Sequence, residues 1–189
     1  MRPFWIGLTI AALAGLAACD ANSTAAPVDG SDLASDKPLL DENGHPLLVP
    51  NTDPGVAVFE SELLRLVNDY RLVLGLAPLI PSARLSDAAR AHSRHMIDHR
   101  FFSHESPEGF SPAVRLTLAN VGWNAVGENI ASGFSTPQAV FEAWMASPEH
   151  RANIESPRFT HAGAGYALDA APTGDFPDVH YWAMAFLRR

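Results

Sequence analysis

The chain has only one cysteine, Cys19, among its 189 residues, so it cannot form an intrachain disulfide. Small domains often depend on disulfides when their hydrophobic core is too small, whereas this chain has to be stabilised by packing. The composition supports a packed core, because 47% of the residues are hydrophobic and 18% are charged. The length predicts one domain. A formal net charge of -8 argues against a nucleic-acid-binding protein, which would carry a basic face.

The sequence around this cysteine has the features of an export signal. Arg2 supplies a positive charge, and the uncharged apolar run from Phe4 to Ala18 is shorter than the roughly 20 residues of a membrane-spanning helix. The letters LAAC, residues 16–19, resemble the bacterial lipobox, in which the cysteine is lipidated and the chain is cut before it. We therefore predict a signal peptide over residues 1–18 and an exported protein that lipidated Cys19 anchors to a bacterial membrane. A cleaved signal with an unmodified cysteine and an uncleaved anchor remain alternatives.

The residues after the cysteine predict a tether rather than a folded segment. Residues 19–54 are rich in Ala, Ser, Asp, Pro and Gly and show no steady hydrophobic period, which is typical of flexible linkers. His45 lies in this span, and we expect it to be solvated. Asp20 resembles the signal that retains lipoproteins in the inner membrane of some Gram-negative bacteria, which would place the domain on the periplasmic side.

Hydrophobic periodicity starts at Val56 and predicts a folded domain over residues 55–189. In VFESELLRLVNDYRLVLGL, apolar residues recur three and four positions apart, as in an amphipathic helix, and Gly75 ends the pattern. Four further helices are predicted within residues 81–100, 111–123, 135–147 and 147–154. The segments 161–170 and 180–187 predict strands, and residues 126–133 are expected to be extended at their start or to form a tight bend. The predicted fold class is α+β, with helices on a small antiparallel sheet.

Five of the eight histidines are assigned ordinary structural roles. His92, His95 and His99 share one helix at three- and four-residue spacing, but no glutamate completes an H-E-x-x-H metal site. We expect His92 to be buried and hydrogen-bonded, and His95 and His99 to be exposed. His161 and His180 begin strands and are expected to lie on the surface.

Three other residues are candidates for a site. His104 follows an aromatic pair and precedes a loop rich in Pro and Gly, and such loops present functional side chains from a rigid scaffold. His150 lies near a helix N-terminus, where the helix dipole favours the neutral imidazole that binds metal or acts as a base. Glu128 has glycine and short apolar neighbours, which suggests partial burial and a need for a partner.

Seven collinear segments resemble the bacterial branch of the CAP superfamily, which includes cysteine-rich secretory proteins, antigen 5 and plant pathogenesis-related proteins and whose domain is also called SCP. They run from about Val56 to the C-terminus: LVNDYRLVLGLAPL, LSDAARAHSRHM, FFSHESPEG, GENIASG, AWMASPEHRANI, FTHAGAGYA and YWAMAFL. The resemblance implies an α-β-α sandwich with a cleft that holds two histidines and two acids.

The family's site residues carry over onto His104, Glu128 and His150. The resemblance implies that the two histidines bind a divalent metal, often zinc, and that Glu128 supports an imidazole. The family's second acid corresponds to Ser147, where this chain departs from the pattern; Glu149 or Glu142 are the candidate replacements. Ser147 is also expected to begin the helix that aims His150. Because structural zinc usually has four protein ligands, two histidines predict weak binding.

Three functions remain open at this point. The first is a membrane-tethered binding module for a lipid, a peptide or another component of the cell envelope. The second is a metal-dependent hydrolase that uses Glu128 as its base. The third is a purely structural spacer. No other hydrolase motif is present, and no nucleic-acid partner is expected.

Overall fold

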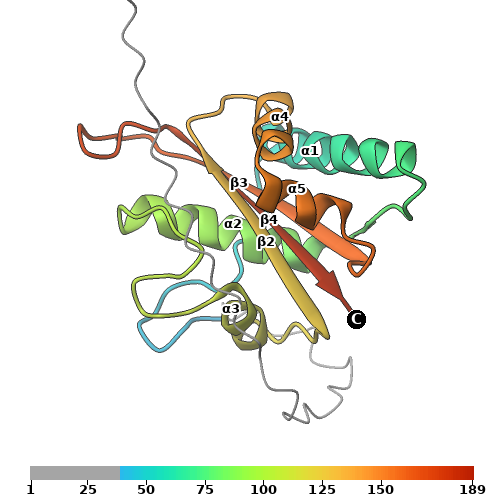
Figure 1. Cartoon of the computed structure of the whole chain (residues 1–189). Coiled ribbons are helices and arrows are strands. Elements are labelled where there is room, and N and C mark those ends of the chain that lie inside the picture. The colour runs from blue at the N-terminus through green and yellow to red at the C-terminus, as the bar shows by residue number, and fades with distance from the viewer. Residues whose placement is uncertain (1–38) are drawn as a thin grey trace, which may run out of the picture.

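The computed structural model describes residues 39–189, and in it helices cover both faces of a four-stranded sheet (Figure 1). The helices and strands, in chain order, are α1 (Pro54–Val73), β1 (Ile80–Pro81), α2 (Ala83–Asp98), α3 (Pro112–Leu118), β2 (Ala125–Ser132), α4 (Pro137–Ala146), α5 (Pro148–Glu155), β3 (His161–Leu168) and β4 (His180–Arg188). The predicted α+β class is confirmed. Within residues 39–189, no helix is both long and apolar enough to cross a membrane.

The sheet has the strand order β1-β3-β4-β2. The strands β3 and β4 pair antiparallel over their whole length, and β4 pairs antiparallel with β2 from Ala125 to Ser132. The two-residue strand β1 pairs parallel with β3, so the sheet is mixed rather than purely antiparallel. Residues 126–133, for which a tight bend was an alternative, form most of a regular edge strand.

Strand β4 separates two hydrophobic cores, because alternate side chains of a strand point to opposite faces of the sheet. Its odd-numbered residues from Tyr181 to Leu187 belong to the core under α2 and α3. Its even-numbered residues from Trp182 to Phe186 belong to the core under α1, α4 and α5. Both faces of this strand are buried, which gives the three-layer arrangement that the CAP resemblance implied.

Strand β3 lies unusually close to helix α2. A Cβ atom added at Gly163 would lie 2.2 Å from the backbone nitrogen of Ser86, and one at Gly165 would lie 2.1 Å from that of Arg90. No side chain fits at either position. The two glycines therefore let the helix backbone rest directly on the strand.

Four of the five helices begin with a polar residue whose side chain caps the first turn. The side chains of Asp53, Ser82, Ser111 and Thr136 each accept a hydrogen bond from a backbone N–H in the first turn of their helix. Ser147 differs, because it occupies the N-cap of α5 without a side-chain capping bond. The helix instead begins at Pro148, and the carbonyl of Ser147 accepts from the N–H of Arg151 at 2.9 Å.

The described residues begin inside the span that was expected to be a flexible tether. Leu47 is 8% exposed and belongs to the core under α2, and the N–H of Val49 donates to Asp87 O at 3.1 Å. Residues 39–49 are thus packed onto the domain and are not part of a flexible tether. They contain leucines and a valine, although the span 19–54 as a whole is rich in small and polar residues. The predicted signal peptide and Cys19 lie outside the described residues.

Candidate functional site

The free edge of β2 is the place where the predicted site residues meet. This strand ends the sheet, and Glu128 lies in its middle opposite Ala185 of β4. The loop after α2 brings His104 to the strand from one side, and α5 brings His150 from the other. The ring centroids of the two histidines are 6.4 Å apart, at an interplanar angle of 54°. We call these two side chains the histidine pair.

Glu128 is a buried, fully paired carboxylate. Its Oε2 accepts a 2.6 Å hydrogen bond from Arg115 Nη2, and its Oε1 lies 3.0 Å from His104 Nδ1. Burial would raise the pKa of this carboxyl, but Arg115 above all, and then the neighbouring His92 and His104, lower the pKa to about 2. The ionised carboxylate accepts a hydrogen bond from Nδ1–H of His104, so Nε2 is the ring nitrogen that this contact leaves available to a ligand.

Arg115 of α3 organises the loop that carries His104. Its Nη1 donates to His104 O at 2.6 Å and to Phe110 O at 2.9 Å, while Nη2 reaches Glu128. One guanidinium therefore fixes both ends of this loop and the glutamate. Sequence reasoning missed Arg115, because an arginine on a short amphipathic helix looks like an ordinary surface residue.

His150 is held in the first turn of α5 by amide side chains. Asn129 of β2 donates to His150 O at 3.0 Å, and Asn153 donates to Glu128 O at 3.1 Å and to Asn129 Oδ1 at 2.9 Å. These bonds tie α5 to the edge of β2. Burial, followed by the nearby His104, lowers the pKa of His150, so its ring is neutral near pH 7.

Within residues 39–189, neither candidate for the family's second acid forms an ion pair with the histidine pair, although the charge of Glu149 acts against burial on the pKa of His150. Glu149 is exposed, and Glu142 is exposed on α4 with its Oε1 accepting from Gln138 at 2.7 Å. In the described part of the chain, the ligand atoms of His104, Glu128 and His150 also do not form a group within 4.8 Å of one another. The site thus offers two imidazoles to a ligand, with Glu128 already engaged.

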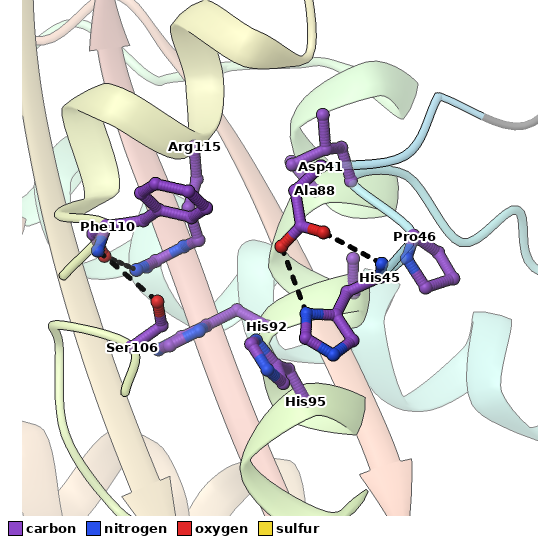
Figure 2. Close-up of a pocket in the computed structure, with 11 residues that line it drawn as sticks. Asp41, His45, Pro46, Ala88, His92, His95, Ser106, Phe110 and Arg115 are labelled. Atoms are coloured by element: carbon purple, nitrogen blue, oxygen red, sulfur yellow. Dashed lines mark hydrogen bonds and ion pairs between the residues drawn. The ribbon is translucent and has the colours of Figure 1, made fainter. Parts of the chain in front are cut away.

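Two small pockets adjoin the site. One has a cavity volume of about 20 Å³ and is lined by residues that include His92, His95 and Arg115 (Figure 2). The other has about 10 Å³ and includes Glu128 and Arg115. Volumes of this size hold about one water molecule. Neither of these two pockets has room for a ligand much larger than water.

The remaining histidines partly follow expectation. His92 is 1% exposed and its Nε2 lies 3.0 Å from Ser103 O, so the prediction of a buried, hydrogen-bonded histidine is confirmed; burial lowers its pKa to about 4. His99 is exposed as expected, but the side chain of His95 is only 11% exposed. His45, expected to be solvated, is 25% exposed and contacts both of them.

The comparison with protein families decides the identification. Residues 64–186, which are most of the folded domain, match the family model described as CAP, the cysteine-rich secretory protein family. The chain belongs to the CAP family. The family resemblance and fold predicted from the seven sequence segments are thereby confirmed.

Two Bacillus subtilis proteins are relatives of this CAP protein. YkwD is 42% identical over 111 residues, which are 59% of this chain and 43% of YkwD. YlbC, a membrane protein, is 31% identical over 130 residues, which are 69% of this chain and 34% of YlbC. The matched part thus spans less than half the length of each relative.

Solved structures share the CAP fold. An extracellular protein from Bacillus anthracis that contains an SCP domain superposes with a TM-score of 0.62 at 27% identity, over 75% of this chain and 45% of its own. An outer surface protein from Borrelia burgdorferi superposes with a TM-score of 0.61 at 20% identity, over 68% of this chain and 91% of its own. The second likeness concerns the fold alone.

Proposed function

We propose that this CAP protein is an exported, membrane-tethered binding module, and that its histidine pair binds a divalent metal beside the surface that takes a lipid, a peptide or another envelope ligand. The observation that carries this proposal is the convergence of His104 and His150 at the edge of β2, with Glu128 fixing one ring. Two imidazoles next to solvent are suited to zinc, and water would fill its remaining positions.

The geometry fits an open, weak metal site. With Zn–N distances near 2.0 Å, two imidazoles on one ion have ring centroids at most roughly 6.4 Å apart, and the observed separation is 6.4 Å. Tetrahedral binding therefore requires the rings to move closer. The side chain of His104 is 48% exposed, so there is space for its ring to turn toward His150 about the contact with Glu128.

The hydrolase alternative is less well supported. A general base has to be within reach of a water molecule and to have a pKa near the working pH. Both oxygens of Glu128 are engaged, and its pKa is lowered to about 2, with Arg115 as the main opposing charge to burial. Glu128 is thus suited to orienting His104 rather than to taking a proton.

Zinc titration by calorimetry tests the histidine pair. Both His104→Ala and His150→Ala are expected to weaken binding at this site by at least about 10-fold, since each removes one of two protein ligands. His161→Ala is the matched control, because His161 bonds Thr160 outside the site. Zinc binding that is the same in all four proteins would contradict the proposal.

Export and anchoring rest on the N-terminal sequence and on relatives. The Bacillus anthracis neighbour is an extracellular protein, and YlbC is a membrane protein. Each CH₂ of an attached acyl chain that enters a membrane stabilises the association by about 0.8 kcal/mol.

The change Cys19→Ser is expected to move the protein from the membrane fraction to the soluble fraction, because the only thiol that can accept a lipid is removed. Fractionation of cells followed by immunoblotting measures this distribution. Membrane retention equal to that of the wild type would rule out the lipid anchor.

A further inference from the structure

A second group of potential metal ligands lies apart from the histidine pair. Three imidazoles and one carboxylate, from His45, His95, His99 and Glu108, each offer one ligand atom, and these atoms all lie within 4.8 Å of one another. They come from three segments, which are residues 39–49, helix α2 with its C-cap, and the loop after it. We propose that this group, called here the His45 cluster, binds a zinc ion that clamps residues 39–49 to the domain.

The three rings lie close enough together for one ion to reach all of them after small ring rotations. Their centroids are 4.4 Å apart for His95 and His99, 4.5 Å for His45 and His99, and 4.6 Å for His45 and His95. His95 and His99 are one turn apart at the end of α2, where residues four positions apart share a face. Figure 2 shows His45 beside His95, held over α2 by the segment that carries Asp41 and Pro46.

Buried polar atoms without a hydrogen-bond partner favour a cation at this position. His95 Nε2 and Glu108 Oε2 are buried and make no hydrogen bond within residues 39–189. Buried polar atoms without a partner are rare, and a bound ion is one of their few explanations. Nε2 of His95 lies 3.4 Å from Glu108 Oε1. Two ligands of a tetrahedral zinc with bonds near 2.1 Å are separated by about 3.4 Å.

His45 has the supporting carboxylate that metal-binding histidines usually have. Its Nδ1 lies 3.0 Å from Asp41 Oδ2, and the side chain of Asp41 is only 2% exposed. The other oxygen of Asp41 accepts from the backbone N–H groups of Asn43 and His45, at 2.8 and 2.9 Å. Asp41 therefore favours the tautomer with Nδ1–H, and the same Nδ1 lies 3.8 Å from Glu108 Oε1. In the proposed site, the second ring nitrogen, Nε2, would bind the metal.

The donor set distinguishes the His45 cluster from the histidine pair. Four protein ligands make a closed site of the kind that holds structural zinc, whereas two leave positions open. The cluster joins a segment before α1 to α2 and to the loop that also carries His104. Zinc in it would hold residues 39–49 down and stabilise the folded state, since a ligand that binds only the folded protein raises its stability.

Calorimetric zinc titrations of the full-length protein test the proposal with two variants. His99→Ala removes an exposed ligand and is not expected to disturb folding, and Glu108→Gln keeps the shape of the side chain but removes its charge. Both are expected to weaken one zinc-binding event by at least about 10-fold relative to the wild type. Loss of a residue that only supports a ligand already weakens metal binding about 10- to 100-fold, and these two variants each change a direct ligand. His161→Ala is the matched control. Cobalt(II) in place of zinc should give the visible absorption of a tetrahedral ion in the wild type and in this control, but not in the two variants.

The double variant His104→Ala/His150→Ala separates this site from the histidine pair. It is expected to retain the binding event that His99→Ala weakens, and to keep the protection that zinc gives to the amides of residues 39–49 against hydrogen exchange. If zinc binding in His99→Ala and Glu108→Gln equals that of the wild type, or if only the double variant loses zinc, the clamp is overturned. Loss in both single variants with none in the double variant would support the clamp and reject the metal at the histidine pair.

Discussion

Replacing Gly165 by alanine is expected to destabilise the protein by about 3 kcal/mol, the upper end of the usual cost of overpacking. The added Cβ would lie 2.1 Å from Arg90 N and 2.4 Å from Ala89 C, both backbone atoms of α2. A flexible side chain could turn away from such a contact, but a helix backbone can only move as a unit. The whole of α2 would have to lift from β3, and the histidines at its C-terminal end would move with it.

Urea unfolding of the purified variant, followed by circular dichroism, measures this loss. Gly174→Ala is the matched control, because a Cβ at Gly174 meets nothing within 4 Å. The control should leave the unfolding midpoint almost unchanged. A Gly165→Ala protein whose stability is within about 1 kcal/mol of the control would show that the close approach of helix and strand is not a constraint.

Replacing Glu60 by alanine is expected to cost about 3–5 kcal/mol, because it removes one partner of a buried ion pair. Glu60 on α1 accepts from Arg90 Nε at 2.8 Å and Arg90 Nη2 at 2.6 Å, and each side chain is 8% exposed. Its Oε1 also accepts the N–H of Tyr166 at 3.0 Å. On the side of β3 that faces β1, β1 pairs only with His161 and Ala162. Within residues 39–189, the N–H of Tyr166 therefore has no strand partner on that side, and Glu60 takes the place of one.

The same arginine connects four parts of the fold. Arg90 also donates to Asp87 at 2.9 Å and to the carbonyl of Val49. Without Glu60, a guanidinium would remain buried among α1, α2, β3 and residues 39–49 with only part of its charge compensated. The loss should therefore appear as global unfolding at lower urea concentration rather than as local fraying.

A variant that removes both charges gives a sharper measurement. Glu60→Leu/Arg90→Met removes both charges and should be more stable than Glu60→Ala, because well-packed apolar side chains replace a buried pair at little cost. Glu62→Ala is the control: its pair with Arg65 is exposed, so little change is expected. If Glu60→Ala behaves like Glu62→Ala, the buried pair does not stabilise the protein.

The candidate site was only partly predictable from the sequence. Local features mark His104, Glu128 and His150 as separate candidates, and only the family resemblance implies that they share a cleft; the structure brings them together at the edge of β2. Arg115, which holds the loop and the glutamate, gave no local signal. Ser147 occupies the N-cap of α5 without a side-chain capping bond, and Asn129 holds the backbone of His150 in place.

The His45 cluster illustrates the opposite case. The separation of about fifty residues between His45 and His95 conceals their contact, and a composition rich in Ala, Ser and Pro suggested a solvated histidine. The structure shows instead that Leu47 lies in the core and that the N–H of Val49 donates to Asp87 of α2. A few apolar residues suffice to fix a short segment against a folded domain.

The amino-acid sequence determined the positions of the helices and most strands, since periodicity, caps and prolines act within a few residues of one another. It also determined that no intrachain disulfide can form. Only the tertiary structure decided which side chains meet: the pairing of β2 with β4, the contact of α2 with Gly163 and Gly165, and both histidine groups. Such contacts depend on how whole layers pack, and no local pattern records the distance between residues that are far apart along the chain.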